Sequence, residues 1–418
     1  MHELSPGALA SLPDEALLEA LQRRTFRFFW DGAEPESGLA RDRNRESADA
    51  DDHLVAVGGS GFGVMAMIVA VSRGWITRDA AVARLDRMLS ALEGAERHHG
   101  VFPHFLDGAT GMTIPFGAQD DGGDLVETSF LMMGLLAARS WLDRPADAGL
   151  RSRITALWES VEWDWHVQPG QAVLTWHWSP RHGFAMNHAI RGWNECLITY
   201  VLAAASPTHG IGREIYEQGF CDGPDYRNGN SYYGIRLPLG PALGGPLFFT
   251  HYSFCGLNPR GLRDAHADYW EQNVAQARIN HAHCRANPGG FAGYGPACWG
   301  LTASDDPDGY DAHAPGNDNG TISPTAALSS FAYTPNEAFA ALRGFLQTQG
   351  ARIWGRYGFT DAFNIGRDWF ADTFLAIDQG PIVVMIENYR TGLLWKLFMS
   401  VPDIRAGLAR LGFETVSA

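Results

Sequence analysis

Several segments of this sequence are predicted to form helices that are apolar on nearly every side. The ranges 58–73, 130–138 and 186–205 are mostly apolar, and a helix of this kind has to be buried among other elements. The ranges 14–31 and 77–94 instead carry apolar residues at intervals of three and four, which is typical of helices with one exposed face. The alternation predicts an all-α fold, a closed toroid of helical hairpins with the apolar helices inside.

About a dozen helices are expected, and the strand signal is sparse, with one weak hairpin strand at 173–178. Long loops cover 99–117, 229–256 and 288–324. Loops of this length in a compact domain usually bind ligands or act as lids, and alternate connections in a hairpin toroid open at one end. We therefore expect an acidic, aromatic cleft there. The other predicted helices cover 146–162, 207–220, 260–287, 326–330, 335–349, 369–377, 381–398 and 402–411.

No linker, charge block or low-complexity stretch divides the chain, which predicts a single domain over 1–418. The 32 basic and 47 acidic side chains give a formal net charge of −15. A surface this negative repels nucleic acid and anionic membranes, so neither is an expected partner. No apolar run reaches about 18 residues, which predicts no membrane-spanning helix.

The first residues, Met1-His2-Glu3-Leu4, lack the basic and apolar regions of an export signal. We therefore expect a cytoplasmic protein, or a periplasmic one if a leader has been removed. The five cysteines form no C-x-x-C pair, which argues against a disulfide framework and a zinc site. We expect a monomer without a cofactor.

Three acids enter one of the apolar helices. Asp120, Asp124 and Glu127 lie directly before the apolar run 130–138. Asp124 and Glu127 are three residues apart and share one face of a helix, whereas Asp120 lies in a glycine-bearing turn before it. Burying a carboxylate at such a place costs free energy unless it caps the helix, pairs with a cation or takes part in catalysis. Capping of the helix start explains one or two of the three acids, and an acid cluster at the mouth of a pocket explains all of them.

Glu195 is a further acid in apolar surroundings, inside the predicted helix 186–205. A partly desolvated carboxyl has a raised pKa and stays protonated near neutral pH. The alternative is a structural glutamate that pairs with Arg191, four residues earlier.

Two more acids have open interpretations. Glu387 lies in an apolar stretch and either pairs with Arg390 or contacts a substrate. Asp378 comes just before Gly380-Pro381 and either caps a helix or reaches into the pocket.

No metal site is predicted. The range 120–124 lacks the register of a calcium loop, and Asn317-Asp318-Asn319-Gly320 is better explained by turns, which such residues favour. His281 and His283 have no further ligand near them in the sequence. Serine-nucleophile and nucleotide-binding motifs do not occur in a usable context.

The acids and the aromatic content together indicate glycoside hydrolysis. Two carboxyls that flank a sugar bond are its usual apparatus: one protonates the leaving oxygen, and the other activates water or attacks. The chain has 14 Trp, 12 Tyr and 23 Phe residues, and flat aromatic rings are platforms on which sugar rings stack.

The sequence resembles the bacterial glycoamylase-like family and, within it, the endo-β-1,2-glucanases of glycoside hydrolase family 144. The resemblance covers roughly 20–400 and is specific. It is carried by T-F-R-F-F-W (25–30), G-W-N-E (192–195), S-P-T-H (206–209), G-P-L-F-F (245–249), G-L-N-P-R-G (256–261), C-W-G-L-T-A-S-D (298–305), G-T-I-S-P-T-A-A (320–327), Y-G-F-T-D-A-F-N (357–364) and the range 378–390.

The resemblance implies an (α/α)6 barrel that hydrolyses β-1,2-linked glucose with inversion and without a cofactor. The acid cluster of the family matches Asp120, Asp124 and Glu127, and its G-W-N-E glutamate, the general acid, matches Glu195. A carboxylate of the cluster is expected to activate the attacking water, either directly or through a hydroxyl of the substrate. The candidates for holding glucose units are Arg41, Trp176, His177, Trp299, Asp305, Asp378, Glu387 and Arg390.

Three other functions remain open at this point. One is exo-action on β-1,2-oligomers with release of sophorose or glucose, and a related one is transglycosylation. The third is a glucan-binding protein without catalysis, against which the acids in apolar settings argue, because a binder needs no acid of raised pKa.

Overall fold

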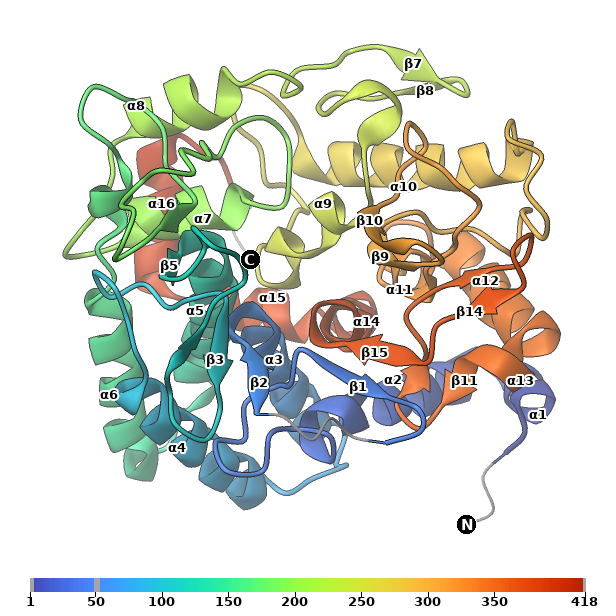
Figure 1. The fold of residues 1–418 in the computed structure, drawn as a ribbon, viewed down its shortest axis with the longest axis horizontal. Helices are drawn as coiled ribbons and strands as arrows, with labels where there is room; N and C mark the ends of the chain where they lie inside the picture. The colour runs from blue at the N-terminus through green and yellow to red at the C-terminus, as the bar shows by residue number, and fades with distance from the viewer. Residues whose placement is uncertain (1–3, 49–52, 416–418) are drawn as a thin grey trace.

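The computed structural model describes residues 4–48 and 53–415, and these residues are mostly helical (Figure 1). Every strand in these ranges has two to four residues, and the strands form sheets of two or three. The prediction of a mostly helical chain is therefore confirmed, although fifteen short strands form in these ranges where the sequence signals one. No helix of the described ranges has the length and the apolar character needed to cross a lipid bilayer.

Four helices are buried over most or all of their length: α3 (Val57–Ser72), α5 (Leu125–Trp141), α7 (Leu197–Ala205) and α14 (Ala376–Arg390). Helix α3 packs against both α5 and α14, and α5 also packs against α7. Helices α3, α5 and α7 overlap the ranges that the sequence predicts to be apolar, and they are buried because a helix without a polar face has to pack against other elements.

Helices with one buried face lie toward the rim of the view in Figure 1. The N-cap of α4 (Arg78–Gly94) is Thr77, whose hydroxyl accepts a hydrogen bond of 3.2 Å from the Ala80 N–H. These rim helices are α2 (Asp14–Trp30), α4 (Arg78–Gly94), α6 (Ala148–Glu159), α10 (Tyr269–Ala286), α12 (Pro335–Thr348) and α16 (Pro402–Leu411).

Shorter elements connect the long helices. The short helices are α1 (Pro6–Ala10), α8 (Arg213–Ile215), α9 (Phe248–His251), α11 (Pro324–Leu328), α13 (Gly350–Ile353) and α15 (Leu393–Met399). The strands are β1 (Arg43–Arg45), β2 (Leu54–Ala56), β3 (Phe105–Asp107), β4 (Thr113–Ile114), β5 (Gly123–Asp124), β6 (His177–Trp178), β7 (Ser231–Tyr232), β8 (Ile235–Arg236), β9 (Ala303–Asp306), β10 (Gly309–Ala312), β11 (Trp354–Gly355), β12 (Gly358–Phe359), β13 (Phe363–Asn364), β14 (Trp369–Phe370) and β15 (Thr373–Leu375).

The helix predicted over 186–205 begins only at Leu197. Gly192 adopts a left-handed φ of 79°, and its N–H donates to the carbonyl of Phe220 rather than to a helical partner. Glu195 therefore lies in the turn before α7 and not inside the helix.

The helix predicted over 369–377 is wrong, because this range forms β14 and β15. Strand β15 pairs antiparallel with β1, with Thr373 opposite Arg45 and Leu375 opposite Arg43. Pairing with a distant strand has overridden the local pattern here. The range 381–398 is not one helix either, because α14 ends before Gly392, whose φ of 70° starts α15 in a new direction.

Three smaller expectations also change. The range 207–220 holds only α8 and one π-helical turn over Tyr216–Cys221. The strand expected at 173–178 is reduced to β6, and the loop expected at 99–117 contains β3 and β4. Apolar side chains from Leu9 to Phe413 nevertheless form one continuous buried cluster.

Two glycines allow α3 and α5 to touch backbone to backbone. A Cβ atom on Gly61 would lie 2.1 Å from the carbonyl oxygen of Phe130, and one on Gly134 would lie 2.2 Å from the carbonyl oxygen of Gly61. Neither contact can be relieved by a side-chain rotation, because the opposing atoms are backbone. The crossing of these two helices therefore depends on glycine at both positions.

Replacing Gly61 by alanine is expected to force α3 and α5 apart and to lower the free energy of unfolding by about 1–3 kcal/mol. Urea unfolding of the purified variant measures this loss. Gly149→Ala is the matched control, because nothing lies within 4 Å of a Cβ on that helical glycine. It is expected to be neutral or to stabilise by about 0.4–1 kcal/mol, and equal losses in the two variants would contradict the role given to the α3–α5 contact.

Candidate active site

The acid cluster is held where β5 meets β6, at the start of α5. The two strands pair antiparallel, with Asp124 opposite His177 and Gly123 opposite Trp178. Asp120 precedes β5 in a turn that forms a bridge with Gly117. The pairing brings residues that are more than fifty positions apart in the sequence to the mouth of a buried helix.

Asp124 is the N-cap of α5 and is fully buried. Its Oδ1 accepts hydrogen bonds from the backbone N–H groups of Val126 (3.0 Å) and Glu127 (2.9 Å) and from the indole N–H of Trp176 (2.9 Å). Its Oδ2 lies 3.0 Å from Nδ1 of His104. The capping interpretation is therefore correct for Asp124, and the side chain has further partners that a cap alone does not need.

His104 carries the positive charge of the cluster. Burial lowers the pKa of its imidazole, but the charges of Glu127, Asp124 and Asp120 and the hydrogen bond to Asp124 together raise it to about 9. Burial likewise raises the pKa of Asp124, and His104 and the nearby His177 bring it below its ordinary value. Asp124 and His104 thus form a charged pair at neutral pH.

The other two acids of the cluster have raised pKa values. Burial and the charge of Asp124 raise the pKa of Asp120 to about 6. They also raise the pKa of Glu127 to about 7, although Glu127 accepts a 2.7 Å hydrogen bond from the N–H of Gly58. His177 Nε2 lies 3.4 Å from Asp120. The cluster therefore combines a permanently charged carboxylate with two that can exchange a proton near neutral pH.

The turn that carries Glu195 is fixed by its neighbours. The Ser253 hydroxyl donates to the Glu195 carbonyl and accepts a 2.9 Å hydrogen bond from the N–H of Ile198. The side chain of Asn194 accepts from the N–H of Cys196 and donates to the carbonyl of Arg191, at 3.0 and 3.2 Å. These hydrogen bonds fix the backbone of the turn from which the Glu195 side chain extends.

Burial raises the pKa of Glu195 to about 7, and the charges of Asp124 and Glu127 contribute to the rise. Glu195 and the cluster therefore lie near enough to influence each other electrostatically, as the sequence predicts. Arg191 is exposed, and no ion pair joins it to Glu195 in the described part of the chain. The interpretation of Glu195 as one half of a structural ion pair is wrong.

A second group of buried acids consists of Asp305, Asp361 and Asp378. Oδ2 of Asp361 accepts a 2.7 Å hydrogen bond from the N–H of Asp305. Burial, with the charge of Asp305, raises the pKa of Asp361 to about 7, and burial with the charge of Asp361 raises the pKa of Asp378 strongly. Two such carboxyls do not both ionise at neutral pH. Asp378 lies in the first turn of α14.

Two tyrosine hydroxyls lie within electrostatic range of these acids. Burial raises the pKa of Tyr252, and Asp378 and Glu195 both add to the rise. Burial also raises the pKa of the Tyr310 hydroxyl, with contributions from Asp378 and Asp361, although 53% of this residue is exposed. The Tyr252 hydroxyl is thus within electrostatic range of both Glu195 and Asp378.

The remaining sugar-contact candidates separate into two sets. Trp176 and His177 lie in the cluster, where their rings stack with centroids 5.5 Å apart, and Arg41 is buried in a bridge with Val55 beside β2. Three others have packing roles, and their assignment as sugar contacts is corrected. Trp299 is fully buried, and its indole N–H donates to the carbonyl of Glu337. Glu387 is fully buried and pairs with Arg73 rather than with Arg390. Arg390 pairs with Glu15 and Glu19 of α2.

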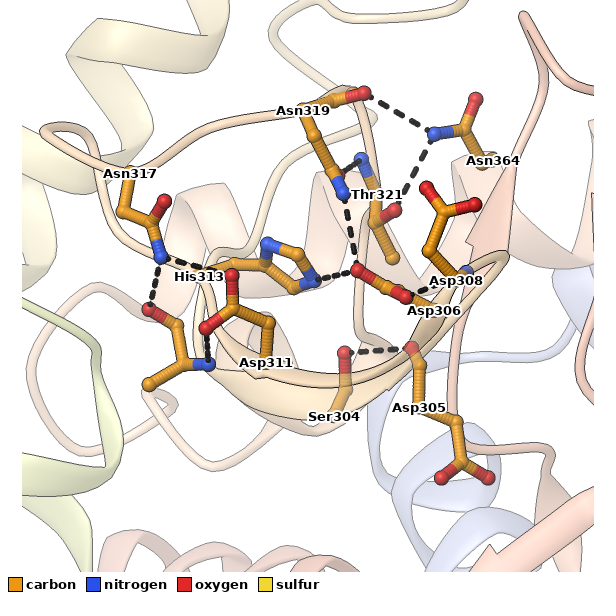
Figure 2. Close-up of polar contacts among 12 residues, drawn as sticks. Ser304, Asp305, Asp306, Asp308, Asp311, His313, Asn317, Asn319, Thr321 and Asn364 are labelled. Carbon is orange, nitrogen blue, oxygen red and sulfur yellow. Dashed lines mark hydrogen bonds and ion pairs between the residues drawn. The ribbon is translucent and has the colours of Figure 1, made fainter.

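The Asx-rich loop after β10 folds into turns. Figure 2 shows that Asp306 accepts hydrogen bonds from the N–H of Asp308 (2.7 Å) and the side-chain amide of Asn319 (3.0 Å). Asn317 donates in the same way to Asp311 at 3.1 Å. Because amide donors occupy these carboxylates, the loop is built as a hydrogen-bonded scaffold under the β9–β10 hairpin.

The fold does bring possible metal ligands together, which the sequence does not show. One atom each of His104, Asp120 and Asp124 lie within 4.8 Å of one another. With its pKa raised to about 9, His104 is protonated at neutral pH, and a protonated imidazole cannot ligate a metal. The charge state of these residues therefore favours an ion pair at this place.

His104, Tyr252 and Asp361 are site residues that sequence reasoning missed. None of them stands in a local acid pattern, and His104 lies twenty residues before its partner Asp124. Asp361 is part of the stretch 357–364, which is a useful signal only in hindsight, because the pattern of the stretch does not single out one carboxyl.

Comparisons with known proteins agree on one family. The glycoamylase model, described as "Putative glucoamylase", matches residues 187–402. A curated relative from Parabacteroides distasonis, named "Exo beta-1,2-glucooligosaccharide sophorohydrolase (non-reducing end)", is 46% identical over 96% of this chain. This chain spans 58% of the length of that relative.

Solved structures resemble the fold closely. An endo-β-1,2-glucanase from Chitinophaga pinensis, in complex with sophorotriose and glucose, superposes with a TM-score of 0.94 at 48% identity over 97% of this chain and 99% of its own. A β-1,2-glucanase from Parabacteroides distasonis gives a TM-score of 0.92 at 45% identity over 96% of this chain and 60% of its own.

The raised pKa of His104 predicts how stability depends on pH. Because the folded pKa is about 9 and the ordinary value is 6.5, the charged pair stabilises fully below pH 6.5 and is lost as the pH rises through 9. His104→Asn is expected to remove on the order of 1–3 kcal/mol of this stabilisation at neutral pH. Urea unfolding between about pH 6 and pH 10 measures it.

The control for this measurement is His182→Asn, an exposed histidine. Its pH dependence of unfolding is expected to match that of the unmodified protein. A His104→Asn curve parallel to the unmodified one over the whole range would show that His104 is not charged in the folded protein.

Proposed function

We propose that this chain, which belongs to the glycoamylase family, is a glycoside hydrolase that cleaves β-1,2-glucan internally and with inversion. Its similarity to an endo-β-1,2-glucanase and to a sophorohydrolase supports the β-1,2 linkage as the bond that is cleaved. We also propose that the helices form a single (α/α)6 barrel over 1–418, and that the protein acts as a cytoplasmic monomer without a cofactor.

The observation that carries the proposal is the contrast between Glu195 and Asp124. The Glu195 carboxyl has a pKa of about 7, so much of it is protonated near neutral pH, whereas Asp124 stays charged. A protonated carboxyl near a charged carboxylate can act as the general acid of glycoside hydrolysis. In this proposal Glu195 protonates the glycosidic oxygen as the bond to the leaving glucose unit breaks.

The base is a carboxylate of the cluster, acting on water directly or through a sugar hydroxyl. Asp124 has the least freedom to take up a proton, because both of its oxygens already have partners. Its negative charge raises the pKa values of Asp120 and Glu127 and so makes them better proton acceptors. Inversion requires that the acid and the base lie far enough apart to admit a water molecule.

The second candidate function is exo-action, with release of sophorose from chain ends. The observation in its favour is the 46% identity to a relative whose name gives that activity. Transglycosylation would use the same acid and base with a sugar in place of water. A binding protein without catalysis is a weaker proposal, because it has no use for the raised pKa of Glu195.

Replacing Glu195 by glutamine is expected to keep the fold and glucan binding and to lower kcat on β-1,2-glucan by about 10²–10⁴-fold, since the proton donor is lost. A substrate with an acidic leaving group, such as an aryl sophoroside, should lose much less. Glu214→Gln, at an exposed glutamate, is the control and should not change the rate. Turnover of the natural glucan at the unmodified rate by Glu195→Gln would refute the assignment.

The products distinguish the two modes of action. Endo-cleavage of linear β-1,2-glucan is expected to give a ladder of oligosaccharides early in the reaction, and exo-cleavage gives one short product throughout. Proton NMR during the first turnovers is expected to show the α-anomer, because inversion of a β-linkage produces it. Initial release of the β-anomer, or comparable hydrolysis of an α-1,4-glucan, would contradict the proposal.

A further inference from the structure

A groove of about 290 Å³ lies beside the second acid group. It is lined by Arg43 and Arg45 of β1, by the β9–β10 turn and by the segment from Trp369 to Thr373. Its size is close to the lower end of the roughly 300–1,000 Å³ that ligand pockets occupy. The helix predicted over 369–377 would not have formed this wall, which exists because the range folds as strands.

Trp369 differs from every other tryptophan of the chain. The other thirteen each stack on or lie against another ring or an arginine, and Trp369 does so with none among the described residues. Its neighbour Phe370 is covered by the guanidinium of Arg352, 3.4 Å from the ring centroid, and by Phe363. A half-buried indole ring without an aromatic or cationic partner among the described residues can serve, on its exposed side, as a platform for a ligand.

Charged pairs that can bind hydroxyl groups line the same groove. An Arg43 N–H lies 3.3 Å from Asp305 Oδ1, and the Thr373 hydroxyl donates to Asp305 Oδ2 at 2.6 Å. Arg45 pairs with Asp372 at 2.6 Å, and both of these residues are exposed. An apolar ring beside fixed donors and acceptors matches a sugar, which has an apolar C–H face and a polar edge.

The groove borders the second acid group, because Asp305 lines it and donates its N–H to Asp361, and it lies within electrostatic range of the first cluster. Asp42 pairs with Arg43 at the groove, and its charge contributes to the raised pKa of Glu127 in the cluster. On the other wall, Tyr310 lies opposite Asp305 in the β9–β10 pairing. Tyr310 and Glu195 both contribute to the raised pKa of the Tyr252 hydroxyl. A chain of glucose units bound at the acids can therefore extend into the groove.

We infer that this groove is an outer subsite that binds glucose units of β-1,2-glucan at a distance from the cleaved bond, with the indole of Trp369 as its platform. This inference rests on the proposed function. It makes the enzyme prefer long chains, since only a long chain fills the catalytic centre and the groove together. Arg43, Arg45 and Asp305 then fix the orientation of the bound sugar through its hydroxyls.

The test compares chain lengths. For Trp369→Ala, the ratio of kcat/KM on long β-1,2-glucan to kcat/KM on the shortest cleaved oligosaccharide is expected to fall about 3- to 10-fold. The loss should appear in KM more than in kcat, and Trp369→Phe should recover part of it. Tyr233→Ala removes an exposed aromatic ring on the β7–β8 hairpin, which lies at the top of Figure 1 and away from β1 and β14, and should leave the ratio unchanged.

An unchanged ratio in Trp369→Ala, or an equal loss on both substrates, would overturn the subsite. Calorimetric titration of linear β-1,2-glucan into Glu195→Gln protein, with and without Trp369→Ala, separates the two proposals. If the unmodified protein does not cleave the glucan but Trp369→Ala still weakens its binding, the function fails and the subsite stands. If cleavage occurs and binding does not depend on Trp369, the function stands and the subsite fails.

Discussion

Asp124 accepts hydrogen bonds from the start of α5, from the indole of Trp176 and from His104. The same carboxylate therefore caps a buried helix, anchors the β6 segment and provides the charge that sets the pKa values around it. A buried charge without such partners would cost several kcal/mol. The helix cannot be buried there without its cap, and the site cannot hold its charges without the helix.

The inner helices place this cap with little freedom. Gly61 and Gly134 bring α3 and α5 into backbone contact, and the N–H of Gly58 at the start of α3 reaches Glu127 at the start of α5. The carbonyl of His104 accepts from the N–H of Val57 at the same helix start. Helix packing and the position of the cluster are thus parts of one arrangement, and a shift of α3 would move both Glu127 and His104.

What the sequence predicts here is local. The long helices are visible as apolar runs or as apolar residues at intervals of three and four, and Asp124 stands where a capping acid is expected before an apolar run. The apolar neighbours of Glu195 single it out, and its pKa is raised to about 7, but its turn depends on Gly192 and on Ser253, which is far away in the sequence. The prediction of sugar contacts for Trp299, Glu387 and Arg390 fails for the same reason. Each of these side chains is bound by a partner that is distant in the sequence and is therefore not available to a substrate.

The strands were the hardest part to foresee, and they form much of the walls of the site. Segments of two to four residues carry too little pattern for a period of two to be recognised, and β5–β6 and β1–β15 pair across large distances in the sequence. Such pairings depend on contacts between elements that are distant in the sequence. The long helices can therefore be predicted from the sequence. The short strands that pair Asp124 with His177 and Arg43 with Leu375 can be predicted only when the positions of the helices are known.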